Sequence, residues 1–185
     1  MTNTDSLDKI LILDFGSQYT QLIARKIREQ KVYCEIHPFN YSVDRIKEFS
    51  PKGIILSGGP SSVYGKDAPI IGKEVLELGV PVLGICYGMQ LISHLLGGRV
   101  FSSDKREYGR TEIQILADKA IFEGFDPAQK KTVWMSHGDK IEQLPDGFEV
   151  LAKTDNTPYC AAADFTRRLY TVQFHPEVVH TQGGV

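Results

Sequence analysis

A glycine-flanked cysteine is the residue of this sequence best suited to nucleophilic chemistry. Residues 84–88 read Gly-Ile-Cys-Tyr-Gly, at the point where a short apolar stretch meets helix-forming residues. The pattern Gly-X-nucleophile-X-Gly is typical of a sharp strand-to-helix turn that lifts the nucleophile clear of a sheet. The start of the helix would favour the thiolate of Cys86, and the backbone N–H of Tyr87 would point toward a developing oxyanion. A buried structural cysteine is the alternative interpretation.

A histidine and a glutamate two residues apart follow the apolar residues 169–174. A thiol that attacks an amide needs a proton donor, because an amine leaves poorly unless it is protonated. Side chains two positions apart in an extended chain point to the same side. Glu177 could therefore orient the ring of His175 while the other ring nitrogen faces the thiol. We predict a Cys86–His175–Glu177 triad, in which the glutamate fixes the tautomer of the histidine.

Residues 135–139, Met-Ser-His-Gly-Asp, offer a second histidine after a predicted strand. The neighbouring Asp139 suggests a Ser–His–Asp triad, but adjacent side chains on an extended backbone point to opposite sides. This divergence of Ser136 and His137 argues against such a triad. We interpret the segment as a substrate-contacting loop or, alternatively, as a plain turn.

A glycine pair in residues 57–62, Ser-Gly-Gly-Pro-Ser-Ser, suggests a loop that binds an anion. The phosphate-loop pattern fails, because Pro60 stands where a glycine is required and Asp67 where Ser or Thr is required. Two glycines at the end of a parallel strand would expose backbone N–H groups. We therefore expect Gly59 to contribute to an oxyanion hole, with a simple tight turn as the alternative. No G-x-G-x-x-G opens a helix, so a dinucleotide site is not supported.

The elements that must position these residues alternate in the first hundred residues. We predict strands over residues 10–13, 32–36, 53–56 and 80–85, and helices over residues 19–30, 42–49, 70–78 and 87–96. This alternation indicates βαβ units and an open, mostly parallel sheet with helices on both faces. The second half predicts an antiparallel extension through strands over residues 99–101, 111–116, 132–135, 148–153, 159–163 and 169–173. The fold class is α/β, in one domain.

The composition argues against several classes of protein. The chain has 185 residues, of which 42% are hydrophobic and 24% charged, and its formal net charge is −2. This length suits one well-buried domain, and the balance excludes a disordered chain and gives no support to nucleic-acid binding. No apolar run approaches the roughly 18 residues that a membrane span needs.

The cysteines and the first residues indicate the cellular compartment of the protein. Cys34, Cys86 and Cys160 cannot form a complete disulfide framework and contain no CxxC, which favours free thiols in a reducing cytosol. Residues 1–8 lack the basic and apolar regions of a secretory signal. We expect a cytoplasmic protein with neither nucleic acid nor membrane among its partners.

Taken together, five motifs in the same order resemble the class I (triad) glutamine amidotransferases, and among these the glutaminase domains of GMP synthetases. The motifs are residues 14–19 (Asp-Phe-Gly-Ser-Gln-Tyr), 84–90, 135–139, 174–177 and 175–181. The similarity runs from about residue 10 to residue 181. It implies the flavodoxin-like fold of that family and a glutaminase domain over residues 1–185.

The resemblance also implies a reaction. Cys86 would attack the side-chain amide of glutamine to give a γ-glutamyl thioester, while N–H groups of Gly59 and Tyr87 hold the oxyanion. His175 would protonate the departing ammonia and then activate water. No metal is implied. Further residues implied to bind glutamine are Gly58, Gln90, Ser136 and His137.

The ammonia would pass to an ATP-pyrophosphatase (synthetase) domain or subunit, where ATP and magnesium activate xanthosine monophosphate for amination to GMP. We expect no cofactor in this chain itself. Because residues 181–185 lack the final helix of the family, a domain truncated before the ATP-pyrophosphatase domain is favoured over a free-standing subunit. Alternatives are a glutaminase serving anthranilate, CTP or carbamoyl phosphate synthesis, a related cysteine peptidase, or a non-enzymatic regulatory module.

Overall fold

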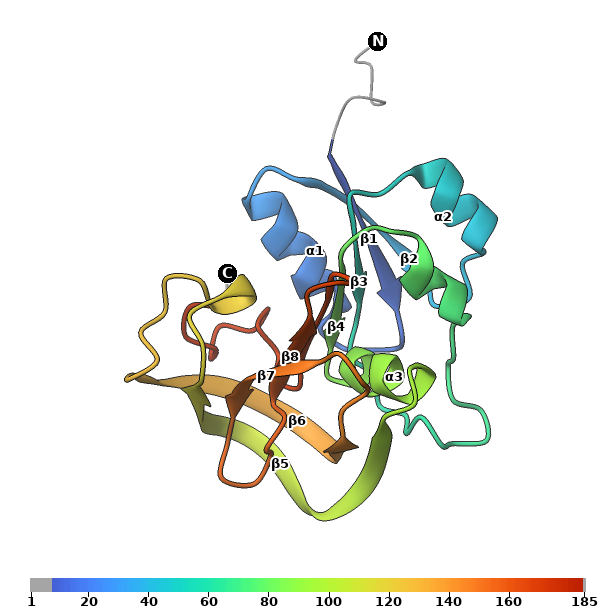
Figure 1. Ribbon diagram of the computed structural model, residues 1–185. Helices are drawn as coiled ribbons and strands as arrows, with labels where there is room; N and C mark the ends of the chain where they lie inside the picture. Colours follow the sequence, from blue (N-terminus) through green and yellow to red (C-terminus); the bar gives the residue numbers. More distant parts are fainter. Residues whose placement is uncertain (1–7, 185) are drawn as a thin grey trace.

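The computed structural model describes residues 8–184, with the backbone alone for residues 103–106. Residues 1–7, which belong to the segment expected to lack a secretory signal, lie outside the described residues. The strands of the described chain form one nine-stranded sheet in the order β2-β1-β3-β4-β9-β8-β7-β5-β6 (Figure 1). The predicted α/β class is confirmed.

The first five strands in this order are parallel, as the alternation of strands and helices predicted. They are β2 (Tyr33–Pro38), β1 (Lys9–Asp14), β3 (Gly53–Leu56), β4 (Val82–Ile85) and β9 (Leu169–Val172). The connecting elements are α1 (Thr20–Glu29), α2 (Val43–Phe49), η2 (Lys73–Glu77) and α3 (Tyr87–Leu95). The chain goes from β1 outward to β2 and returns to β3, so the strand order reverses beside β1, where ligands of open α/β sheets bind.

The antiparallel extension predicted for the second half is also present. Beyond β9 the sheet continues through β8 (Ala161–Asp164), β7 (Glu149–Lys153), β5 (Arg99–Ile115) and β6 (Lys130–Gln143). A short 3-10 turn, η3 (Ala120–Phe122), lies between β5 and β6. Strand β9 joins the two halves, because it pairs in parallel with β4 and antiparallel with β8.

Three predicted strands differ from the structure in their extent. The strands expected over residues 99–101 and 111–116 belong to the single strand β5, which ends at residue 115, and the strand expected over residues 132–135 continues through residue 143 as β6. The interpretation of residues 136–139 as a loop or turn was therefore wrong. Pairing with β5 holds these residues extended, although Gly and Asp on their own favour a turn.

The helix predicted over residues 70–78 is a short 3-10 helix, η2. Gly72 and Gly79 stand on either side of it and leave room for only one or two turns. Short helical pieces of this length commonly adopt the tighter 3-10 geometry. The other short helix follows its prediction, since the side chain of Ser42 caps α2 by accepting a hydrogen bond from the N–H of Arg45 at 3.4 Å.

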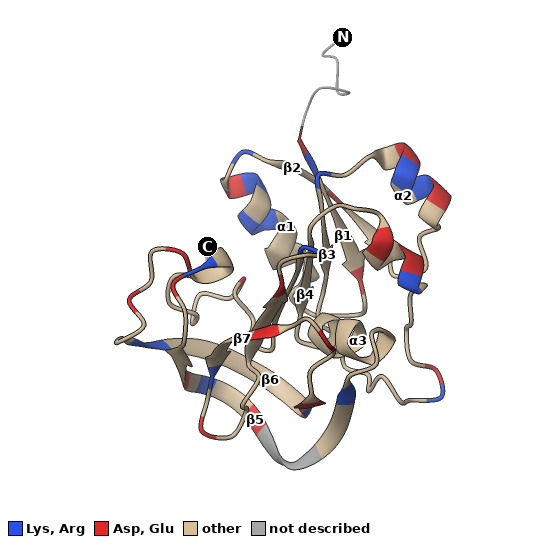
Figure 2. Ribbon diagram, in the orientation of Figure 1, with Lys and Arg blue, Asp and Glu red and all other residues tan. Residues whose placement is uncertain are grey.

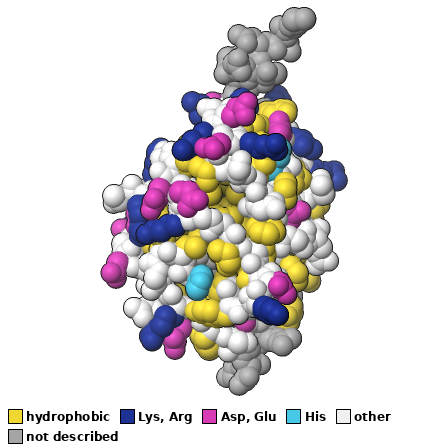
Figure 3. All heavy atoms as spheres, turned by 90° about the vertical axis from the view of Figure 1, so that its right-hand side faces the viewer, with side chains coloured by type: hydrophobic (Ala, Val, Ile, Leu, Met, Phe, Trp, Pro, Cys, Tyr) yellow, Lys and Arg dark blue, Asp and Glu magenta, His cyan; other side chains and the backbone are white. Residues whose placement is uncertain are grey.

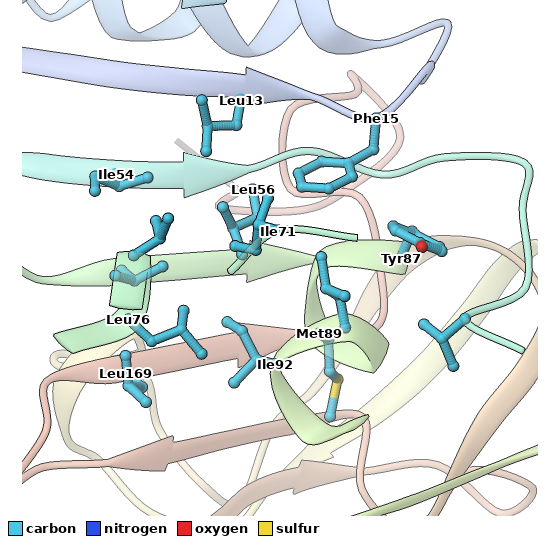
Figure 4. Packing of buried hydrophobic residues seen from close by; sticks show 14 of the residues in the cluster. Leu13, Phe15, Ile54, Leu56, Ile71, Leu76, Tyr87, Met89, Ile92 and Leu169 are labelled. Atoms are coloured by element: carbon cyan, nitrogen blue, oxygen red, sulfur yellow. The ribbon is translucent and has the colours of Figure 1, made fainter. Parts of the chain in front are cut away.

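The side chains of β1 show how the sheet is covered on both faces. Leu11 and Leu13 join a buried cluster with residues of α2, η2 and α3, whereas Ile12 joins a second cluster with α1 and the antiparallel strands. In Figure 1, α1 and α2 accordingly lie on opposite sides of the parallel strands. Figure 4 shows the first cluster gathered between the sheet and α3. Helices on both faces of the sheet were correctly predicted.

Most charged side chains of the described residues lie on the outside of the molecule, and α3 carries none. Lys, Arg, Asp and Glu mark the outer turns of α1 and α2, while α3 carries none of them and is almost wholly buried (Figure 2). Acidic and basic side chains are interspersed on the face displayed in Figure 3. A helix as apolar as α3 can form only against the sheet, which fixes the position of its first residues at the end of β4.

The two glycines around the turn from β4 to α3 are required by close backbone contacts. A Cβ at Gly88 would lie 2.4 Å from the backbone oxygen of Leu56, and a Cβ at Gly84 would lie 2.7 Å from the backbone carbon of Gly88. Real Cβ atoms do not approach backbone so closely, so a side chain at either position would push α3 away from the sheet.

We predict that Gly88→Ala lowers the free energy of unfolding by about 3 kcal/mol, because the added methyl group overpacks the contact with Leu56. Equilibrium urea denaturation measures this. Gly53→Ala is the matched control, since its Cβ would meet only the flexible end of Ile10 at 3.2 Å; we expect a change below about 1 kcal/mol. Equal stability of the two variants would contradict the proposed contact.

Candidate active site

Cys86 lies at a sharp turn between β4 and α3 and has a strained backbone. Its φ of 53° and ψ of −104° belong to a region that residues with a side chain rarely adopt. The N–H of Cys86 donates to the carbonyl of Val172 at 2.8 Å, and its own carbonyl accepts from the N–H of Gln90 at 3.2 Å. Such strain persists only where the surroundings enforce it, and it is common at nucleophiles of this kind. The predicted turn is present.

The pairing of β4 with β9 brings the cysteine and the histidine together. Ile85 is the register partner of Val172, so Cys86 and His175 both follow the carboxyl ends of neighbouring parallel strands. The N–H of His175 donates to the carbonyl of Trp134 in β6 at 2.9 Å, which directs the segment back toward Cys86. Both residues line the same pocket, and the thiol of Cys86 is close enough to the ring of His175 to raise its pKa.

Glu177 holds the other side of the histidine ring. Nδ1 of His175 lies 2.7 Å from Oε1 of Glu177, and both residues are buried, with 3% and 4% of their surface exposed. Because a carboxylate accepts, Nδ1 carries the proton, which leaves Nε2 for Cys86. The ring of Tyr19 packs edge-on against this imidazole, with a centroid distance of 5.0 Å. The structure thus brings Glu177 against His175 and places His175 beside Cys86 on the same pocket, while the triad itself stays a prediction.

The surroundings of His175 favour its charged form. Burial alone would lower the pKa of His175, but hydrogen bonds and electrostatic interactions with Cys86 and Glu177 outweigh burial and raise the pKa to about 10. The ring is therefore an imidazolium at neutral pH, which is the form that can protonate a leaving amine.

Two glycine positions lie close to these side chains. A Cβ at Gly58 would lie 2.9 Å from Cε1 of His175 and 3.5 Å from Cβ of Cys86, so Gly58 makes room for the pair. A Cβ at Gly59 would lie 2.5 Å from the carbonyl oxygen of Phe15, which packs the loop after β3 against the loop after β1. The backbone N–H groups of Gly59 and Tyr87 donate to no backbone carbonyl in the described part of the chain.

An open pocket of about 510 Å³ lies over Cys86 and His175. Of the residues expected to contact substrate, Gly59, Gln90, Ser136 and His137 line it. Gly58, Tyr87 and Glu177 lie behind its wall; the side chain of Tyr87 is fully buried and donates to the carbonyl of Pro69 at 3.0 Å. Burial raises the pKa of Tyr87 to about 12, so its hydroxyl stays protonated.

One wall of the pocket is the strand β6. The thiol of Cys86 lies 3.6 Å from the carbonyl of Ser136, and Nε2 of Gln90 donates to the carbonyl of Asp139 at 2.9 Å. The ring of His137 is buried and lies between that same carbonyl, at 2.9 Å from Nδ1, and a carboxylate of β5. The residues expected as glutamine contacts are thus joined to one another through this strand.

Other pocket residues were missed by the sequence prediction. They include Ser17, Gln18 and Tyr19 from the loop after β1, Ser61 and Ser62 after β3, and Tyr108 and Asp139 on β5 and β6. The loop after β1 is shaped by Asp14, whose Oδ1 accepts from the N–H of Gly16 at 2.9 Å and from Oγ1 of Thr20 at 2.7 Å. Its position at the carboxyl end of a parallel strand is a signal that could have identified it.

Other structural observations concern metals, membranes and thiols. Within residues 8–184, no three side chains of His, Cys, Asp or Glu gather as metal ligands would. No helix in this part of the chain has the length and apolarity to cross a bilayer. Cys34, Cys86 and Cys160 are free and buried, as expected of unpaired thiols.

The sequence and the fold match known proteins. The family model for class-I glutamine amidotransferases matches residues 11–185. The chain is 59% identical over 181 residues to GMP synthase (glutamine-hydrolyzing) of Brachyspira hyodysenteriae, which is 98% of this chain and 35% of that protein. It is 55% identical over 177 residues to GMP synthase (glutamine-hydrolyzing) of Maridesulfovibrio salexigens, which is 96% of this chain and 34% of that protein. The chain thus spans about a third of the length of these curated relatives.

A solved structure extends the similarity to three dimensions. A Thermoplasma acidophilum protein that is provisionally assigned as one subunit of GMP synthase superposes with a TM-score of 0.88 at 33% identity. The match covers 96% of this chain and 88% of that one.

We predict that the ring of His175 stays protonated through neutral pH. Its pKa is raised from 6.5 to about 10, so its stabilising contribution is fully present below pH 6.5 and is lost as the pH rises through about 10. An NMR titration of labelled imidazoles should place the midpoint of His175 far above 6.5. Cys86→Ala and Glu177→Gln should each lower the midpoint, since each removes one of the interactions that favour the charged ring.

Glu35→Gln is the matched control for this titration. Glu35 lies 2.8 Å from Nε2 of His37, so the substitution removes a carboxylate from a different histidine and should leave the midpoint of His175 unchanged. A midpoint of His175 at or below 6.5 in the unsubstituted chain would contradict the assigned interactions.

Proposed function

This chain belongs to the class-I glutamine amidotransferase family, and from that premise we propose that it hydrolyses the side-chain amide of glutamine through a thioester on Cys86. The observation that carries the proposal is that a strained, glycine-flanked cysteine shares a pocket with a histidine whose Nδ1 is held by a buried glutamate. Cys86 and His175 face an open pocket large enough for an amino acid.

The proposed reaction has two halves. The sulfur of Cys86 attacks the amide carbon of glutamine, and Nε2 of His175 gives its proton to the nitrogen, so the C–N bond breaks and ammonia leaves. Water then attacks the γ-glutamyl thioester while His175 removes its proton, and glutamate departs as the sulfur is released. Glu177 keeps the ring in the orientation that both halves need.

We assign the oxyanion to the N–H groups of Gly59 and Tyr87, which donate to no backbone carbonyl of the described residues. The amino-acid end of glutamine would lie against Gln90, Ser136 and His137. Because both hydrogens of the Gln90 amide nitrogen face protein acceptors, at 2.9 Å and 3.5 Å, its oxygen is the atom that would accept from the substrate ammonium. Gly58 makes room for the catalytic pair and does not line the pocket, so we propose no direct contact between it and glutamine.

The fate of the ammonia is proposed from the relatives. Those compared above are named GMP synthase (glutamine-hydrolyzing), and the chain spans about a third of their length. We propose that it is the glutaminase domain of such an enzyme and delivers ammonia in the cytoplasm to an ATP-pyrophosphatase domain or subunit. There ATP and magnesium would activate xanthosine monophosphate for amination to GMP. The names of the relatives favour this acceptor over anthranilate, CTP or carbamoyl phosphate synthesis.

Replacement of the nucleophile gives the direct test of glutamine hydrolysis. Cys86→Ala should reduce the release of glutamate from glutamine by at least about a thousandfold, because no thioester can form. Circular dichroism should show an intact fold. Cys160→Ala is the matched control, because that thiol is fully buried and outside the pocket, and burial raises its pKa. Undiminished hydrolysis by Cys86→Ala would exclude the proposed nucleophile.

A reactive glutamine analogue distinguishes a glutaminase from a peptidase. The diazoketone analogue of glutamine should alkylate Cys86, and added glutamine should slow the reaction, as peptide mass spectrometry can measure. A cysteine peptidase would show neither alkylation by this reagent nor protection by glutamine. Labelling of Cys34 or Cys160 in place of Cys86 would also count against the proposal.

A further inference from the structure

Glu107 is a buried carboxylate behind the pocket that the proposed reaction does not use. It lies on β5, directly after the shift in the register of β5 and β6, and only 7% of its surface is exposed. Oε2 accepts from Oγ1 of Thr157 at 2.7 Å and lies 3.1 Å from Nε2 of His137, while Oε1 accepts from Oγ1 of Thr154 at 3.2 Å. Burial would raise the pKa of Glu107, but these hydrogen bonds outweigh burial and lower the pKa to about 2.

The ring of His137 is held from both sides. Nδ1 lies 2.9 Å from the carbonyl oxygen of Asp139, which can only accept, and Nε2 faces the carboxylate of Glu107. Two acceptors on opposite sides of an imidazole fix the plane and the position of the ring. The side chain of His137 cannot turn without breaking one of these bonds in a buried place, which costs more than the same loss at a surface.

The same strand connects this pair to the rest of the pocket. The carbonyl of Asp139 accepts from Gln90 Nε2 and lies 2.9 Å from Nδ1 of His137, and the carbonyl of Ser136 lies 3.6 Å from the thiol of Cys86. Glu107 is therefore the fixed end of a series of polar contacts that reaches His137 and Gln90, two of the side chains proposed to hold the amino-acid end of glutamine. The catalytic contact between His175 and Glu177 is not part of this series.

We infer that Glu107 is a positioning residue for the glutamine pocket, which acts by fixing His137 and, through it, the pocket wall of β6 and Gln90. The inference rests on the proposed function and adds a residue that touches neither substrate nor reacting atoms. Thr157 has a supporting role, because its fully buried hydroxyl donates to the same carboxylate oxygen. If Glu107 only stabilised the fold, its replacement would disturb glutamine binding and the reactivity of the Cys86 thiol alike. Positioning of the pocket and stabilisation of the fold can therefore be separated by experiment.

Two alkylating reagents that react with the same sulfur separate positioning from folding. Iodoacetamide is small and needs only the thiolate of Cys86, whereas the diazoketone analogue of glutamine must first bind through its amino-acid end. In Glu107→Gln, the rate of Cys86 alkylation by the analogue below saturation should fall about tenfold, as expected for loss of one charged hydrogen bond. The rate with iodoacetamide should change less than about twofold, and the maximal rate with saturating analogue should be retained.

Control variants are available on the same strand and at the same carboxylate. Glu112→Gln removes an exposed charge of β5 that pairs with Lys130 at 3.2 Å, and it should alter neither rate. Thr157→Val removes the hydroxyl that donates to Glu107 and should show a smaller loss with the analogue. Thr157→Ser keeps that hydroxyl and should restore the rate. The Thr157 series also provides the test if Glu107→Gln does not fold.

The outcomes distinguish the inference from the proposed function. If the analogue fails to alkylate Cys86 in the unsubstituted chain, the proposed function is wrong. If it alkylates the unsubstituted chain but reacts equally well with Glu107→Gln, Glu107 is not a positioning residue. Equal losses with both reagents would also overturn the inference, because they would show a general disturbance of the site.

Discussion

The parallel pairing of β4 with β9 is the constraint on which the site depends. It places the ends of two neighbouring strands side by side, so that Cys86 and His175 meet although they lie 89 positions apart in the sequence (175 − 86 = 89). Parallel strands need long crossovers, and here the crossover contains α3 and the whole antiparallel half of the sheet. The antiparallel half in turn carries β6, whose Trp134 carbonyl anchors His175.

The strained turn at Cys86 is a second consequence of this packing. Its left-handed backbone is held by the bond to Val172 on one side and by the start of α3 on the other. The close approaches at Gly84 and Gly88 allow α3 to lie tightly on the sheet, so the buried apolar helix stabilises the unfavourable conformation of the nucleophile. The same few residues thus serve both the core packing and the chemistry. A substitution that loosens the packing of α3 on the sheet also affects the backbone conformation of Cys86.

Much of the parallel half, and the positions of Cys86, His175 and Glu177 near one another, could be predicted from the sequence, because the signals there are local. Short apolar runs between helix-forming stretches mark β1 to β4, and the glycines around Cys86 and the spacing of His175 and Glu177 are visible within a few residues. The extents of β5 and β6 could not be predicted, because these two strands are ordered by pairing with each other and their pairing contains a register shift. Glu107 ends the run Asp-Lys-Arg-Glu, which is typical of a solvated surface, and only the fold brings it under Thr154 and Thr157.

The central claim is that the sulfur of Cys86 carries the γ-glutamyl group, and trapping that group tests it most directly. The chain is mixed with glutamine, quenched in acid within its first turnovers and digested, and the peptide that contains Cys86 is examined by mass spectrometry. We expect a γ-glutamyl adduct on Cys86 that decays as glutamate appears, at matching rates. Release of glutamate with no adduct on Cys86 at any time, or an adduct that decays more slowly than glutamate forms, would contradict the claim.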